Sequence, residues 1–176
     1  YAVEDFSWTQ VSPAVAQLAL SKRIHDEGFK VVFGGEGSDE LFASYGHIFA
    51  WNYKDKDYIK ERYKLVVNLH KNNLIRTNKA MMYGGTVELR TPFLHKDLVE
   101  FCLRIPPKYK QTDDRVWKPM LRKAFSGKLS DELLFRPKKT FQDGCHTIYL
   151  KNHKERIKET YLTHFGQRNP LESFFE

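Results

Sequence analysis

A glycine-rich turn that carries three acidic residues is the part of this sequence best suited to chemistry. Residues 34–42 read GGEGSDELF and include Glu36, Asp39 and Glu40. A turn of this kind between a strand and a helix presents backbone N–H groups to a phosphate. Carboxylates repel a phosphate unless a cation lies between them, and Mg²⁺ is commonly held by one or two carboxylates together with substrate phosphates. The turn therefore predicts a site for a metal-bound phosphate compound.

The sequence on either side of the turn predicts the two elements that must position it. Residues 30–33 contain the apolar run VVF, which indicates a short buried strand. Ser38 or Asp39 can cap the helix that follows. The alternative interpretation is an ordinary strand-to-helix turn whose acidic residues only stabilise the helix N-terminus. A motif this short leaves both interpretations open.

Length and composition are typical of a globular protein. The chain has 176 residues, 41% hydrophobic and 14% aromatic, so a single domain over residues 1–176 is expected. It contains no apolar run of about 18 residues that would span a membrane. No secretory signal is recognised at its start, and two cysteines are too few for a disulfide framework, so a cytoplasmic location is expected. The net charge of +7 permits binding to anions but identifies no partner.

Helical periodicity dominates the remaining sequence. Ser12 followed by Pro13 predicts the start of a first helix, which Gly28 ends. Further helices are expected at residues 55–82, 97–103, 116–125, 131–135 and 147–162, with a turn at 88–94. Residues 30–33 are the only convincing strand. Because a parallel sheet needs partner strands, these are expected in sequence outside the chain or on another chain. The predicted fold class is α/β, predominantly helical.

A basic segment at residues 136–144 forms a second candidate site. It reads RPKKTFQDG and contains Arg136, Lys138 and Lys139. Its proline and glycine are expected to exclude regular structure, with Phe141 anchoring the loop in the core. The three cations could reach over a nucleotide and neutralise charge on a leaving pyrophosphate. The alternative is a basic surface loop.

Four segments in a fixed order carry a family resemblance: GEGSDE at 35–40, ELRTPFL at 88–94, WKPMLRKAF at 117–125, and RPK followed by FQDG at 136–144. The series resembles the synthetase domain of glutamine-dependent asparagine synthetases. The resemblance implies the C-terminal part of an adenine-nucleotide α-hydrolase-like (HUP) domain. It also implies an enzyme that uses ATP and Mg²⁺ to adenylate the aspartate side chain, releasing pyrophosphate. Ammonia from a glutaminase domain then gives asparagine and AMP.

The resemblance also implies roles for individual residues. The nucleotide-contacting positions would be Gly34, Gly35, Gly37 and Ser38. Glu36 matches the acidic residue involved in forming and consuming the acyl-adenylate, a candidate general base for the attacking amine. Asp39 matches the carboxylate that holds Mg²⁺ and pyrophosphate, and Lys138 matches the lysine that contacts the phosphates. Glu88 and Arg90 are interpreted as a structural ion pair.

Two features of the resembled family are absent from this sequence. The pyrophosphate loop, SGGxDS, does not occur, and neither Cys102 nor Cys145 can be the N-terminal nucleophile of a glutaminase. The chain is therefore expected to be a fragment, a split subunit completed by another chain, or a degenerate relative, and to be unable to turn over ATP alone. A homo-oligomer is left open. His95 stands where the family often has aspartate, and a surface position is expected for it.

Other functions are left open by the residues. A related amide-forming enzyme, similar to β-lactam synthetase or a peptide cyclase, would adenylate a different carboxylate. A catalytically inactive basic module would bind a partner protein or nucleic acid. Nucleic acid is disfavoured because the aromatic residues do not alternate with the cations and no familiar nucleic-acid signature occurs. The expected partners are ATP and aspartate, and no membrane contact is expected.

Overall fold

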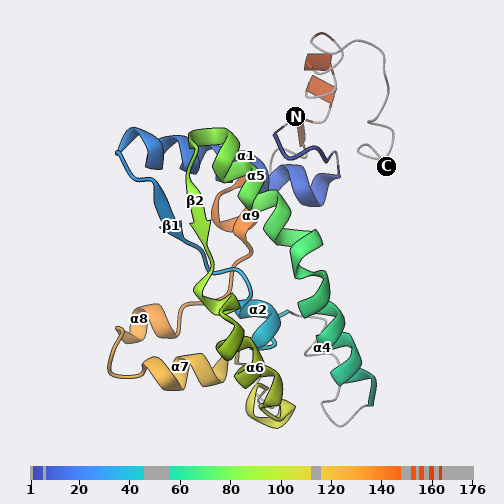
Figure 1. The fold of residues 1–176 in the computed structure, drawn as a ribbon, viewed down its shortest axis with the longest axis vertical. Helices are drawn as coiled ribbons and strands as arrows, with labels where there is room; N and C mark the ends of the chain where they lie inside the picture. The colour runs from blue at the N-terminus through green and yellow to red at the C-terminus, as the bar shows by residue number, and fades with distance from the viewer. Residues whose placement is uncertain are drawn as a thin grey trace. The chain divides into compact units, whose positions relative to one another are not determined.

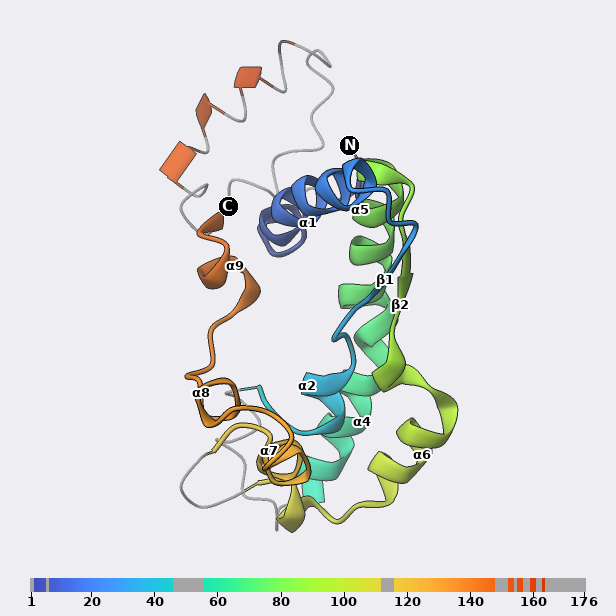
Figure 2. The same cartoon turned by 90° about the vertical axis from the view of Figure 1, so that its left-hand side faces the viewer.

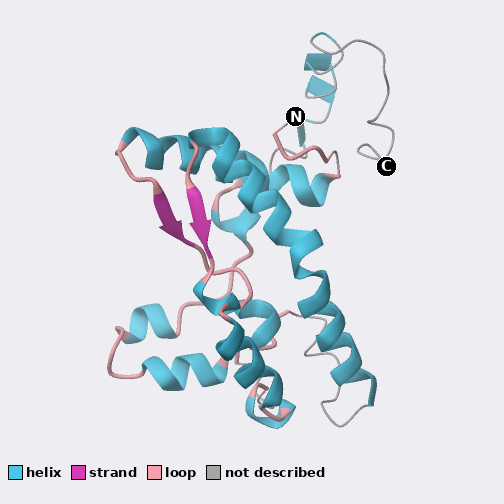
Figure 3. Cartoon of the chain, viewed as in Figure 1, coloured by secondary structure: helices cyan, strands magenta, loops and turns pink. Residues whose placement is uncertain are grey.

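The computed structural model describes residues 2–5, 7–45, 56–111 and 116–147, together with residues 152, 153, 155, 156, 159, 160 and 163. Helices predominate in these residues, with one small sheet (Figure 3). Internal contacts divide the chain into two compact units. The first unit comprises residues 1–32, 75–89 and 139–176, and the second comprises residues 33–74 and 90–138. No helix among the described residues is long and apolar enough to cross a membrane.

Two helices packed side by side form the body of the first unit. α1 (Trp8–Asp26) lies along α5 (Ile75–Gly85), as Figure 1 shows. The contact is close because α5 ends in two glycines. A Cβ atom added at Gly84 would lie 2.8 Å from the carbonyl oxygen of Leu18, which no real side chain tolerates. The two glycines therefore allow α5 to pack closely against α1.

The first helix begins earlier than the sequence predicted. Ser7, with extended backbone dihedrals, is the N-cap residue, and Pro13 lies inside the helix. Pro13 is the sixth residue of the helix, where it removes the backbone hydrogen bond to the carbonyl of Thr9, and the helix continues past it. Ser12 is fully buried, and its hydroxyl donates to the carbonyl oxygen of Thr147 at 3.3 Å. Ser12 therefore makes a tertiary contact instead of the expected cap.

The sheet of the described chain consists of two parallel strands, β1 (Val31–Phe33) and β2 (Glu88–Arg90). The N–H of Glu88 donates to the carbonyl of Lys30 at 2.8 Å. The strand predicted at 30–33 is confirmed. The expectation of a single strand was wrong, because residues 88–90, interpreted as part of a turn, pair with it. Three residues before a proline are too few to show the alternation by which a strand is recognised.

The first strand is not buried as its apolar sequence suggested. Val31 is 36% exposed and Phe33 is 76% exposed. Within the described residues the sheet has two strands only, which leaves these residues partly open to solvent. An apolar run therefore identified the strand correctly but not its burial.

The short helix α2 (Ser38–Leu41) lies at the centre of the second unit. α4 (Lys56–Leu69) and α6 (Lys96–Arg104) both pack against it (Figure 2). Their buried apolar core includes Leu41, Phe42 and Cys102. Cys102 thus occupies a core position.

The remaining helices largely follow the predicted pattern. The long helical stretch expected at 55–82 is formed by α4, the π-helical segment η1 (His70–Leu74) and α5. The other elements of the second unit are η2 (Pro92–Leu94), η3 (Pro107–Tyr109), α7 (Pro119–Phe125) and α8 (Asp131–Leu134). α7 begins at its proline and not at residue 116. Most of the helix predicted at 147–162 lies outside the described residues.

The basic segment differs from its prediction in two ways. Residues Phe141–Gly144 form one helical turn, α9, because the hydroxyl of Thr140 accepts a hydrogen bond from the N–H of Asp143 at 3.2 Å. Phe141 was expected to anchor the segment in the core, but its side chain is 43% exposed. Residues 136–140, which carry the cations, are irregular as predicted.

Candidate active site

The glycine-rich turn connects β1 to α2, as the sequence predicted. Gly37 is the N-cap residue of α2 and has a φ of +91°, a left-handed conformation that favours glycine. A Cβ atom at this position would lie 2.9 Å from Cγ of Leu94 and 3.7 Å from Cδ2 of Leu69. Both the backbone conformation and the packing around the turn therefore require glycine at position 37.

The turn leaves several backbone donors available to a ligand. The N–H of Gly34 is engaged in the sheet, where it donates to the carbonyl of Arg90 at 2.8 Å. Among the described residues, no group accepts a hydrogen bond from the N–H of Gly35, Glu36 or Gly37. An anion could therefore bind these three donors, whereas the N–H of Gly34, an expected nucleotide contact, already has its partner.

Asp39 lies between two lysines that come from distant parts of the second unit. Nζ of Lys118 lies 2.6 Å from its Oδ1, and Nζ of Lys138 donates to Oδ1 and Oδ2, both at 2.8 Å. The hydroxyl of Ser44 also donates to Oδ1. The side chains of Asp39, Lys118 and Lys138 are 26%, 23% and 29% exposed. The structure thus brings together Asp39 and Lys138, which are 99 positions apart in the sequence.

The surroundings of Asp39 keep its carboxylate ionised. Burial is the largest single influence and raises its pKa. The ammonium groups of Lys118 and Lys138 and the hydroxyl of Ser44 together outweigh burial and lower the pKa to about 2. Asp39 therefore carries a negative charge throughout the neutral pH range.

Lys118 is a site residue that the sequence analysis did not select. Its Nζ also donates to Oγ of Ser38 at 2.7 Å, so it holds the start of α2 as well as Asp39. Its backbone is left-handed, with φ and ψ both 51°, a conformation that costs a non-glycine residue on the order of 1 kcal/mol. The only sequence signal was its place in segment 117–125, one of the four segments that carry the resemblance.

Glu36 has a buried carboxylate oxygen, Oε2, that makes no hydrogen bond within the described part of the chain. A buried acceptor without a partner costs on the order of 1–3 kcal/mol, and more when it is charged. A donor supplied by a ligand would remove this cost. Oε2 of Glu36 is therefore available to accept a hydrogen bond or a proton.

Glu40, the third acid of the turn, is engaged in a separate network. It is buried, and its Oε1 accepts hydrogen bonds from the hydroxyl of Tyr45 at 2.6 Å and from Nδ2 of Asn73 at 3.3 Å. Burial raises the pKa of Glu40, and the bond from Tyr45 opposes this shift. Asn73 belongs to the π-helical segment, a feature frequent at functional sites. Glu40 thus ties α2 to η1.

The carboxylates of the turn fit a magnesium ion only in part. Within the described residues, no three His, Cys, Asp or Glu side chains are grouped so that they could hold a metal by themselves. Mg²⁺ held jointly with substrate phosphates needs fewer protein ligands, and carboxylate oxygens are of the right type. However, both oxygens of Asp39 already accept hydrogen bonds from Lys138. The donor set suits Mg²⁺ only when Lys138 leaves Asp39.

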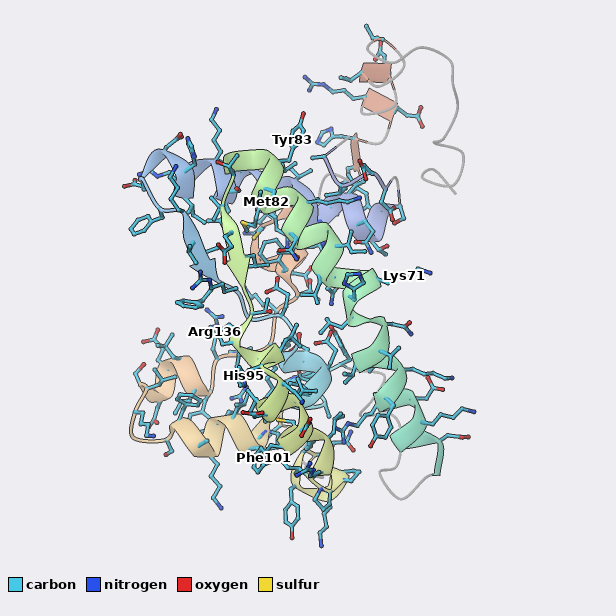
Figure 4. The ribbon with its side chains drawn as sticks, in the orientation of Figure 1. Lys71, Met82, Tyr83, His95, Phe101 and Arg136 are labelled. Atoms are coloured by element: carbon cyan, nitrogen blue, oxygen red, sulfur yellow. The ribbon has the colours of Figure 1, made fainter. Side chains whose placement is uncertain are left out.

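The structure also locates other residues that the sequence analysis selected. His95 precedes α6, is 70% exposed and lies 3.9 Å from Asp97, so it is a surface histidine as expected (Figure 4). Arg136 offers its backbone carbonyl to the guanidinium of Arg122 at 3.4 Å. Glu88 and Arg90 occupy the two ends of β2, and their ion pair remains a prediction.

The comparison of sequences decides the family. The sequence model of the family described as asparagine synthase matches residues 1–65 and 54–175. The chain belongs to the asparagine synthase family. It is similar to glutamine-hydrolyzing asparagine synthetase 1 of Saccharomyces cerevisiae, with 35% identity over 166 residues that cover 88% of this chain and 29% of the relative. It is also similar to a probable asparagine synthetase of Schizosaccharomyces pombe, with 35% identity over 170 residues, 91% of this chain and 29% of the relative.

A plant member of the asparagine synthase family shows the same pattern. Glutamine-hydrolyzing asparagine synthetase 3 of Arabidopsis thaliana is 32% identical over 186 residues, which cover 97% of this chain and 32% of the relative. The chain therefore spans about three tenths of the length of these curated relatives. The family resemblance predicted from the four segments is confirmed. A mostly helical fold with a small parallel sheet is compatible with the predicted α/β class.

Proposed function

We propose that this chain supplies part of the synthetase site of an ATP-dependent ligase that converts aspartate to asparagine. Family membership supports the type of reaction. The observation that carries the proposal is the contact between Asp39 and Lys138, 2.8 Å apart, next to a turn with unengaged N–H donors and an unpaired oxygen on Glu36. A carboxylate, two ammonium groups and backbone donors are the components that phosphoryl and nucleotidyl chemistry requires.

The residues of the turn and the two lysines would bind the phosphates. The N–H groups of Gly35, Glu36 and Gly37 would donate to phosphate oxygens. Lys118 and Lys138 would neutralise the charge that develops on the leaving pyrophosphate, and they are already gathered at one point before the ligand arrives. Mg²⁺ bound through Asp39 would supply charge neutralisation and orient the phosphates.

Glu36 would act in the second half of the reaction. When ammonia attacks the activated carboxyl carbon, a C–N bond forms and AMP departs with the electrons of the C–O bond. The nitrogen must then lose a proton to become an amide. The unpaired Oε2 of Glu36 is the group in the described site best suited to accept it.

We also infer that β1 and β2 are two strands of a larger parallel sheet in a HUP-type domain. The complete enzyme would be cytoplasmic. The SGGxDS loop does not occur in this sequence, so turnover would require that another stretch of polypeptide supply it. Glutamine would be the source of ammonia in the complete enzyme.

Calorimetric titration of the chain with pyrophosphate in the presence of Mg²⁺ tests the site without requiring turnover. We expect binding to the unaltered chain, and affinities lower by about ten-fold or more in Asp39→Asn and Lys138→Gln, since each removes a charged contact. Lys128→Gln is the matched control, because it removes the same charge from an exposed position of the second unit. Absence of binding, or equal affinity in all four proteins, would refute the proposal.

A second measurement identifies the carboxylate substrate. ATP–pyrophosphate exchange by the complete enzyme should depend on aspartate and not on other carboxylic acids. Exchange that depends on a different acid would favour the related amide-forming enzymes. Affinity for nucleic acid that falls steeply with salt, without any binding of pyrophosphate, would favour the basic binding module.

A further inference from the structure

The ammonium group of Lys138 occupies the position at which a divalent cation would bind Asp39. Its Nζ lies 2.8 Å from Oδ1 and 2.8 Å from Oδ2, so it sits between the two oxygens of the carboxylate. Lys118 and Ser44 both contact Oδ1 in addition. A metal ion and the Lys138 ammonium therefore cannot both lie between the two oxygens of this carboxylate at the same time.

We propose that Lys138 exchanges partners when the ligand binds. Without ligand it holds Asp39. When a divalent cation arrives together with pyrophosphate or a triphosphate, Lys138 releases the carboxylate and contacts a phosphate oxygen instead. This inference rests on the proposed function of the site, and it assigns Lys138 a role in deciding which ligands can enter.

The two lysines differ in a way that identifies Lys138 as the one that moves. Lys118 has a second anchor on Oγ of Ser38 at 2.7 Å and is followed by Pro119, the first residue of α7. Within the described residues, the hydrogen bonds and the ion pair of the Lys138 ammonium are all with Asp39, and the backbone around it, residues 136–140, is irregular. Lys118 can thus keep the carboxylate oriented while Lys138 leaves.

The charges of the cluster make the exchange depend on phosphate. Asp39 carries one negative charge, and the ammonium groups of Lys118 and Lys138 already contact its carboxylate. A divalent cation that arrives by itself would have to displace the Lys138 ammonium from this carboxylate and would bring no anion for the lysine to bind instead. Phosphate supplies that anion. We therefore expect metal and pyrophosphate to bind cooperatively and the metal alone to bind weakly.

Electron paramagnetic resonance of Mn²⁺ measures this when it is referenced to protein-free solutions of Mn²⁺ and of Mn²⁺ with pyrophosphate, because the aqua ion, the pyrophosphate complex and the protein-bound ion give different signals. In the unaltered chain, Mn²⁺ should bind weakly alone and at least about ten-fold more tightly with pyrophosphate. In Lys138→Gln, Mn²⁺ alone should bind about five-fold more tightly, since its competitor is gone, whereas pyrophosphate-supported binding should fall about five-fold. Lys128→Gln removes the same charge from an exposed position of the second unit and should change both affinities little.

The decisive result is that Lys138→Gln changes the affinity for Mn²⁺ alone and the affinity for Mn²⁺ with pyrophosphate in opposite directions. Partial unfolding would change both affinities in the same direction, and a general loss of charge would affect Lys138→Gln and the control lysine variant alike. Lys138→Arg, which keeps the cation, should restore the preference for metal with phosphate. The proposed exchange is refuted if Lys138→Gln binds Mn²⁺ alone no more tightly than the unaltered chain does, while pyrophosphate still increases Mn²⁺ binding to the unaltered chain. If pyrophosphate supports no binding to the unaltered chain, the proposed function itself fails.

Discussion

Nζ of Lys110 donates a hydrogen bond to the carbonyl oxygen of Leu41, the last residue of α2, at 2.8 Å. The lysine is fully buried, and it also donates to the carbonyl of Cys102 near the end of α6. A buried cation at the C-terminal ends of two helices interacts favourably with their carbonyl groups. Asp39 and Glu40 are carried by α2, so this contact holds the helix that presents the site.

Lys110 should make the stability of the chain depend on pH in the alkaline range. Burial, with a contribution from nearby Arg62, lowers its pKa from 10.5 to about 7, while the thiol of Cys102 opposes the shift. Between these two values the unfolded state binds more protons than the folded state, so the free energy of unfolding should rise as the pH increases from about 7 to 10. In Lys110→Met this rise should be reduced.

Urea denaturation at several pH values from 6 to about 10 measures the effect of Lys110, with Lys108→Met, an exposed neighbour, as the control. The interpretation of Lys110 as a buried, shifted lysine fails if the unaltered chain and the Lys110→Met variant show the same slope of stability against pH.

Asp39 should contribute stability that is lost in acid. Its folded pKa of about 2 lies below its ordinary value of 3.8, so the contribution is present above pH 3.8 and disappears as the pH falls through about 2. The shift corresponds to about 2 kcal/mol at neutral pH. Asp39→Asn should be less stable at pH 7 by about this amount and should approach the unaltered chain as the pH is lowered. A difference that stays constant from pH 7 to 3 in urea denaturation would contradict this.

Two glycines of the turn should respond differently to the same substitution. Gly37→Ala forces a side chain into a left-handed backbone position and against Leu94, and it should reduce the free energy of unfolding by about 1–3 kcal/mol. Gly35→Ala meets no atom within 4 Å and should leave stability within about 0.5 kcal/mol. Under the proposed function it should nevertheless weaken pyrophosphate binding, because the added methyl group stands beside the N–H donors. Thermal unfolding and calorimetry on the same pair of variants separate the two effects.

The hydrogen bond from Tyr45 to the buried carboxylate of Glu40 should be costly to remove. In Tyr45→Phe the acceptor loses its shorter hydrogen bond, 2.6 Å, and the chain should lose about 1–3 kcal/mol of stability. The substitution Glu40→Gln removes the buried charge, so the double variant Glu40→Gln/Tyr45→Phe should be more stable than the sum of the two single changes predicts. Additive losses in a double-mutant cycle would show that the two side chains are not coupled.

The glycine-rich turn illustrates what could be predicted from local sequence. The strand before it and the helix after it were both recognised, because apolar runs, glycines and capping residues act over a few neighbouring positions. β2 was missed because three residues before a proline show no periodicity. The burial of β1 was misjudged for a related reason, since an apolar run does not reveal what covers it.

The sequence by itself determined the family of this protein, the acidic turn and most of its helices, because these are expressed in residue order and local periodicity. Only the tertiary structure decided which charges meet. Lys118 contacts Asp39, although the two residues are far apart in the sequence and no local pattern predicts their contact. Lys138 binds the Asp39 carboxylate, which was expected to hold a metal. The structure also shows that Glu40 belongs to a separate hydrogen-bond network with Tyr45 and Asn73. The physical reason is that ion pairs and buried hydrogen bonds depend on distance in space and on exclusion of water, which the order of residues along the chain does not specify.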